Sequence, residues 1–151
     1  MKEKNQNFFF ELNLEADHCI KHVFWADARS KVAFEYFRDV VSFDTTYNTN
    51  RYSVQSHIVS CSVHVHLSVH HGLGALIYVG SFVGVNHHGH STLLGCALMK
   101  NEDIQSFKWL FECWLRPMGG KAPKGILTDQ CASIQRAIEP CMPITIHRWC
   151  I

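Results

Sequence analysis

The sequence predicts a single α/β domain, in which strands and helices alternate around one core. Its 151 residues are a usual length for one domain, and 47% of them are hydrophobic, which supplies enough apolar surface for a core. Extended apolar runs and amphipathic helical runs follow one another along the chain. Two of the short apolar runs end in an aspartate, Asp44 and Asp129.

The first elements predicted are a β-hairpin and a helix. Residues 8–14 and 19–25 form two extended runs around a polar turn. Asp27 is a suitable N-cap for a helix that extends to Phe37. The residues spaced to share the apolar face of this helix are Ala28, Val32, Ala33 and Tyr36.

Three strands and the most strongly amphipathic helix are predicted next. Residues 40–43 are an apolar run of a buried strand with Asp44 at or inside its end, because residues 45–47 also favour extended backbone. Residues 82–85 pair antiparallel with 92–99 through a turn at Gly89. A helix then begins with Asn101 as its cap. Its apolar stripe contains Ile104, Phe107, Phe111, Trp114, Leu115 and Met118, and Gly119 and Gly120 follow it.

The last predicted elements are a strand, a short helix and a strand. Residues 125–128 form an apolar strand that ends at Asp129. Residues 132–138 form a helix that Pro140 closes, and 144–149 form the final strand.

Charge and cysteine content exclude several classes of protein. Lys and Arg total 14 and Asp and Glu total 13, so any contact with nucleic acid must be local. The seven cysteines include no C-x-x-C pair, which argues against a disulfide framework and a self-contained zinc finger. The longest nearly apolar stretch, 72–85, is shorter than the roughly 18 residues of a membrane-spanning helix. The sequence therefore predicts a soluble protein with reduced thiols and no secretion signal.

Asp44 and Asp129 are the candidate site residues. Strand interiors avoid aspartate, and an unpaired buried carboxylate is costly, so a compensating partner is expected. A divalent cation such as Mg²⁺ is one such partner, and a pair of these ions can catalyse phosphodiester chemistry. The alternative is that each aspartate caps a turn or the following helix.

Several segments, in order along the chain, resemble the Mutator-like transposase domain. They are most similar to its plant form, the far-red-impaired-response family of transposase-derived transcription regulators. The resemblance covers nearly everything except residues 54–81. The segments are 7–9, 24–27, 40–47, 82–89, 93–98, 109–112, 118–120 and 128–130.

This resemblance implies a ribonuclease-H-like fold, a mixed sheet flanked by helices in which the acids of a D-D-E set meet at adjacent strands. Asp44 matches the first acid and Asp129 the second, as vestigial catalytic and metal-binding residues. The third acid lies beyond a C-x-x-H element, of which Cys150 is the first residue here. We therefore expect a fold that is incomplete at the C-terminus. Glu139 is too early to be the third acid.

The resemblance also predicts the domain organisation. Residues 1–38 form an approach segment, and 39–151 form a partial transposase domain with an atypical insertion at about 54–81. The insertion lies within a stretch from Tyr52 to Met99 that lacks Asp, Glu, Lys and Arg, and we interpret it as translated noncoding sequence. Its histidines, His64, His66, His70 and His71, are either incidental or a zinc site.

The function implied is that of a nuclear, transposase-derived regulator of transcription that acts through DNA or protein contacts. We expect no enzyme activity and no required cofactor, with Mg²⁺ or Mn²⁺ needed only by an active transposase and zinc bound only by full-length relatives. DNA, transcription-related proteins or a dimer with such relatives are the expected partners, without a membrane or a small-molecule substrate. The alternatives are a fragment of an active transposase and a nonfunctional truncated product.

Overall fold

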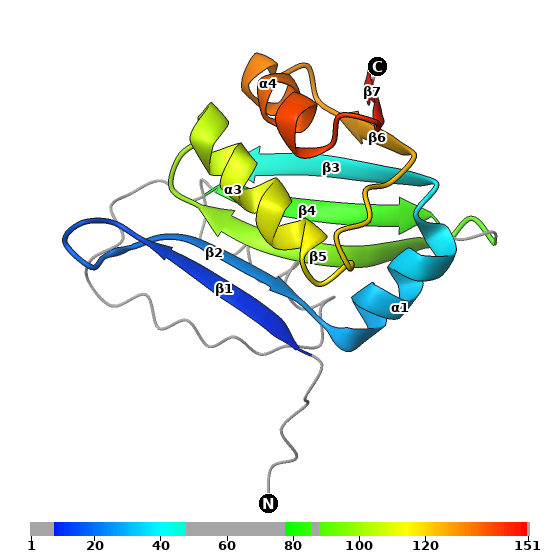
Figure 1. Cartoon of the computed structure of the whole chain (residues 1–151), viewed down its shortest axis with the longest axis horizontal. Coiled ribbons are helices and arrows are strands. Elements are labelled where there is room, and N and C mark those ends of the chain that lie inside the picture. The colour runs from blue at the N-terminus through cyan, green and yellow to red at the C-terminus, as the bar shows by residue number, and fades with distance from the viewer. Residues whose placement is uncertain (1–7, 48–77, 86–87, 151) are drawn as a thin grey trace, which may run out of the picture.

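The protein is an α/β domain with a seven-stranded mixed sheet and three helices in the part that the structure describes (Figure 1). The structure is a computed structural model, and it describes residues 8–47, 78–85 and 88–150. The order of strands in the sheet is β1-β2-β5-β4-β3-β6-β7. The α/β prediction is therefore confirmed.

The N-terminal hairpin forms one edge of this sheet. Strands β1 (Phe9–Leu14) and β2 (Ile20–Ala26) pair antiparallel, and β2 then pairs antiparallel with β5 (Ser91–Met99). Both strands of the hairpin thus belong to the same sheet as the central strands.

Helix α1 (Ala28–Phe37) begins as predicted but buries a different face. The carboxylate of Asp27 accepts a hydrogen bond from the backbone N–H of Ser30 at 2.7 Å and so caps the helix. The buried side chains of α1 are Ser30 and Phe34, whereas Val32 is 56% and Tyr36 74% exposed. The predicted face is wrong because Phe34 packs edge-on against Trp114, a contact that local spacing does not reveal.

The central strands place the acid-bearing segment in the middle of the sheet. Strand β3 (Val40–Tyr47) pairs antiparallel with β4 (Tyr78–Val85), and β4 pairs antiparallel with β5. On its other side β3 pairs parallel with β6 (Gly125–Thr128), and β6 pairs parallel with β7 (Ile146–Trp149). Strand β3 continues to Tyr47, so Asp44 lies inside the strand, which is one of the two positions expected for it.

Helix α3 (Ile104–Leu115) begins two residues later than a cap at Asn101 predicts. Its N-cap is Asp103, whose carboxylate accepts from the N–H of Ser106 at 2.8 Å. Asn and Asp side chains can both cap a helix, and in this structure Asp103 is the residue that does so. Beyond the helix, Gly119 and Gly120 have φ angles of 70° and 73°, which glycine adopts without strain.

Helix α4 (Ala132–Cys141) runs three residues past its predicted end at Ile138 and includes Pro140. Proline removes one N–H donor, and the N–H of Met142 still reaches the carbonyl of Ile138 at 2.8 Å. The last turn therefore forms in spite of Pro140.

The main core lies between the sheet and the three helices, which all contribute to it. Phe82 of β4 stacks on Trp114 of α3, and Phe43 of β3 packs against Phe111. A smaller cluster, Val23, Trp25 and Cys96, lies on the opposite face of β2 and β5 because side chains alternate along a strand.

The predicted insertion falls largely outside the described residues. Only 78–81 are described, and they form the first half of β4. The histidines at 64, 66, 70 and 71 are among those not described. Among the described residues, none of the helices has the length and apolar character needed to span a bilayer.

Candidate functional site

The parallel pairing of β3 with β6 determines where the two candidate acids lie. The register matches Val41 with Ile126 and Ser42 with Leu127. The paired part of the two strands ends at Ser42 and Leu127, so Asp44 in β3 and Asp129 after β6 both lie just beyond it.

Asp44 lies on the sheet face opposite the main core. Its neighbours in β3, Val41 and Phe43, are buried in that core, whereas Asp44 itself is exposed. The cross-strand partners of Asp44 on this face are Ser81 and, one strand further, Cys96. The acid therefore projects from the face that carries the smaller cluster.

Asp129 is exposed and does not cap the following helix. The N-cap residue of α4 is Cys131, and no side chain makes a capping hydrogen bond there. The backbone carbonyl of Asp129 accepts from the N–H of Cys131 at 2.8 Å and from the hydroxyl of Thr128 at 2.9 Å. The alternative of a helix cap is therefore wrong for Asp129.

A polar connection between β6 and β7 fixes the backbone next to Asp129. The buried hydroxyl of Thr128 lies 2.8 Å from Nε2 of His147, and burial lowers the pKa of this imidazole. The N–H of Cys150 donates to the carbonyl of Thr128 at 2.7 Å. Cys150 is thus held beside β6 through its backbone, and its side chain is exposed.

The acid pair offers ligands suited to a hard cation. Carboxylate oxygens of the kind that Asp44 and Asp129 carry are those that Mg²⁺ and Mn²⁺ prefer. Two carboxylates are a partial set, because fixed geometry at two metals needs further ligands. Across 8–47, 78–85 and 88–150, no three His, Cys, Asp or Glu side chains form a metal-binding group. Glu139 lies exposed in α4.

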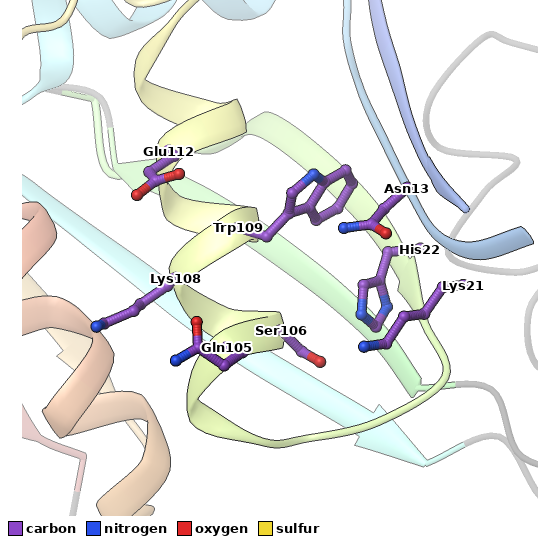
Figure 2. A pocket seen from close by; sticks show the side chains of 8 residues that line it. All are labelled: Asn13, Lys21, His22, Gln105, Ser106, Lys108, Trp109 and Glu112. Carbon is purple, nitrogen blue, oxygen red and sulfur yellow. The ribbon is translucent and has the colours of Figure 1, made fainter. Parts of the chain in front are cut away.

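Sequence patterns did not indicate a polar pocket between the hairpin β1–β2 and helix α3. Figure 2 shows His22 and Lys21 of β2 facing Trp109 and Ser106 of α3 across it. No local pattern predicts this pocket, because its residues come from segments about 80 positions apart and become neighbours only through the pairing of β2 with β5.

Comparison with protein families identifies the chain. Residues 75–151, half of the chain, match the model of the MULE transposase domain. The chain belongs to the MULE transposase domain family. The resemblance that the sequence segments indicated is thereby confirmed.

The chain, with its MULE transposase domain, is also similar to curated proteins of Arabidopsis thaliana. It is 40% identical to Protein FAR-RED IMPAIRED RESPONSE 1 over 97% of its length. It is 36% identical to Protein FAR1-RELATED SEQUENCE 4 over 100%, and 37% identical to Protein FAR1-RELATED SEQUENCE 5 over 99%. The chain spans only 15%, 18% and 16% of these three relatives.

Proposed function

We propose that the protein is a transposase-derived nuclear regulator of transcription, related to the plant far-red response proteins, that acts through DNA or protein contacts without catalysis. The observation that supports this most directly is the similarity of nearly the whole chain to FAR-RED IMPAIRED RESPONSE 1. A regulator of transcription must reach chromatin, so the proposal includes a nuclear location.

We further propose that the fold is ribonuclease-H-like. The mixed sheet, the helices packed on it, and an acid in β3 with another directly after the neighbouring β6 are the features that support this assignment. In this assignment Asp44 and Asp129 are relics of a cation site.

Tethering the chain to a reporter promoter in plant protoplasts tests the regulatory role. We expect reporter output to change, and we expect the double variant Asp44→Asn, Asp129→Asn to change it equally. Unchanged output with the wild-type chain contradicts a regulatory role for this domain. An effect that the double variant abolishes contradicts the proposal that the acids are dispensable.

A fragment of an active Mutator-like transposase is the second candidate, and it is favoured by the pairing of β3, which contains Asp44, with β6, which Asp129 follows. Incubating the purified chain with supercoiled plasmid and Mg²⁺ or Mn²⁺ tests whether the chain itself retains transposase chemistry. We expect no nicking or joining of the DNA. Cleavage that is lost in Asp44→Asn establishes the transposase instead.

A further inference from the structure

Strand β1 is an open edge of the sheet that the structure describes. It stands first in the strand order, and β2 is its one described neighbour (Figure 1). An edge strand presents backbone N–H and C=O groups to which another strand can pair, and natural proteins often prevent this with lysine, proline or a bulge. Strand β1 (Phe9–Leu14) contains no lysine or proline. The bulge beside Asn13 adds Lys21 to β2 and leaves β1 regular.

An exposed apolar row follows β1 on the sheet face opposite the main core. Phe9 packs against the main core, so alternation along the strand places an edge row of Phe10, Leu12 and Leu14 on the opposite face. The three side chains of the edge row are 47%, 42% and 50% exposed. Phe10 and Leu12 pair with the two β2 residues of the smaller cluster. The edge row therefore continues a buried apolar cluster to the open edge of the sheet.

The backbone groups of the edge row point away from β2. The N–H of Glu15, directly after β1, donates to the carbonyl of Cys19 at 2.8 Å on the β2 side of the hairpin. The backbone groups of successive residues in an antiparallel strand point to alternate sides. Every second residue back from Glu15 therefore faces β2, and the residues of the edge row, which lie between them, face outward. The open edge thus offers donors and acceptors spaced for a further antiparallel strand.

A second copy of β1 complements the edge row in an antiparallel pair centred on Leu12. In this register Leu12 would lie opposite Leu12 of the second copy, and Phe10 would lie opposite Leu14. The outward N–H and C=O groups of the two strands would then meet, and the exposed apolar side chains would form cross-strand pairs. The smaller clusters of the two copies would join into one continuous apolar layer.

Charge on the other face of β1 selects this register over its neighbours. With Leu12 at the centre, Glu11 would face Asn13 of the second copy, and an amide can donate hydrogen bonds to a carboxylate. A shift of one strand by two residues sets Glu11 against Glu11 in one direction and against Glu15 in the other. Like charges directly opposite each other destabilise a sheet. Within each chain Arg116 pairs with Glu11, so this carboxylate is not an uncompensated charge at the edge.

We propose that two copies of this chain form a dimer by pairing β1 with β1 across a two-fold axis at Leu12. A two-fold pair uses the same surface on both copies and closes on itself, whereas pairing of β1 with the opposite edge, β7, would add copies without limit. The contact joins the two described seven-stranded sheets into one and leaves neither β1 edge open. The dimer does not depend on the proposed regulatory function.

Sedimentation velocity of the full chain over a series of concentrations tests this dimer. We expect a monomer–dimer equilibrium without larger species. Leu12→Lys places two ammonium groups opposite each other at the axis and should raise the Kd of the dimer at least about tenfold. Val32→Lys makes the same kind of change at a 56% exposed site on α1 and should leave the Kd within about twofold of the wild type. Because Leu12 is 42% exposed, both variants should retain the circular dichroism spectrum of the wild type.

Disulfide trapping tests the register of the two strands. Leu12→Cys should cross-link to a second copy of itself under air oxidation, because the Cα atoms of residues opposite each other lie about 5.5 Å apart. Leu14→Cys is the matched control, since the two copies of position 14 would lie about 13 Å apart along the strands and should not cross-link. Mass spectrometry of the linked peptides distinguishes position 12 from the native cysteines. A monomer at every concentration, growth beyond the dimer, an equal Kd for Leu12→Lys and the wild type, or no linkage through position 12 overturns the proposal.

Discussion

Phe82 and Trp114 stack face to face, with ring centroids 4.2 Å apart and planes 5° from parallel. Phe82 belongs to β4, next to the acid-bearing β3, and Trp114 belongs to α3. Both side chains are 0% exposed. This contact therefore joins the centre of the sheet to the helix that covers it.

Replacement of Phe82 by alanine should destabilise the fold strongly. The change removes the stacking partner of Trp114 and leaves a cavity, which for Phe→Ala costs about 3–5 kcal/mol. Urea denaturation followed by circular dichroism measures the free energy of unfolding. Val85→Ala, in the same strand but 57% exposed, is the control and should change stability by less than about 0.5 kcal/mol. Similar losses in the two variants contradict the stacked arrangement.

Gly95 has no room for a side chain. A Cβ atom there would lie 3.0 Å from the ring of Phe24 and 3.3 Å from Cδ1 of Trp114. Gly95→Ala should therefore cost about 1–3 kcal/mol through overpacking.

Gly125→Ala is the matched control for this variant, because its new Cβ atom would lie no closer than 3.6 Å to a neighbour. Thermal unfolding should show a lower Tm for Gly95→Ala alone. If Gly95→Ala and the control have the same Tm, the rings of Phe24 and Trp114 do not pack against Gly95.

His22 should make stability depend on pH below neutrality. Its pKa is lowered from 6.5 to about 4, chiefly by burial and further by Lys21, so the unfolded chain binds a proton that the folded chain excludes. The stabilisation that neutral, buried His22 contributes is fully present above pH 6.5. It is lost as the pH falls to about 4. The full loss is about 3 kcal/mol.

The variant His22→Asn isolates this contribution, because its amide oxygen can still accept the N–H of Lys100. Urea titrations between pH 4.5 and 7.5 should show the advantage of the wild type shrinking as the pH falls. Parallel stability curves for the two proteins mean that His22 is not buried in the neutral form.

Cys113 should resist alkylation in the folded protein. Burial raises the pKa of its thiol to about 12, and the side chain is 0% exposed, so little thiolate is present or accessible. Cys150 is exposed and serves as the internal control. Iodoacetamide labelling at pH 8, read by mass spectrometry, should modify Cys150 first and Cys113 only after urea is added. Equal rates without urea contradict the packing of α3 on the sheet.

Local chemistry predicts the elements better than it predicts their contacts. Residues 125–128 were correctly predicted as a strand, and Asp27 as a cap, because a short apolar run and a capping carboxylate act within a few residues. The buried face of α1 was wrong because it is set by the contact of Phe34 with Trp114, 80 positions away.

In the candidate site, too, the residues can be predicted from local sequence, whereas their arrangement in space cannot. Both aspartates stand out in the sequence, but the parallel pairing of β3 with β6, which relates their two segments in space, is encoded by no local pattern. The roles of Asp44 and Asp129 as former catalytic acids, and of Cys150 in a C-x-x-H element, stay predictions. The pocket beside α3 was missed because Lys21 and Trp109 have no recognisable spacing.

The position of β3 between β4 and β6 determines where a shortened version of this domain can begin. The match to the family begins at residue 75, but the strand between β4 and β6 is encoded by 40–47. A polypeptide started at the matched boundary would contain two separate ribbons, β4 with β5 and β6 with β7, and a gap between them. Expression of the domain must therefore start upstream of the segment by which it is recognised.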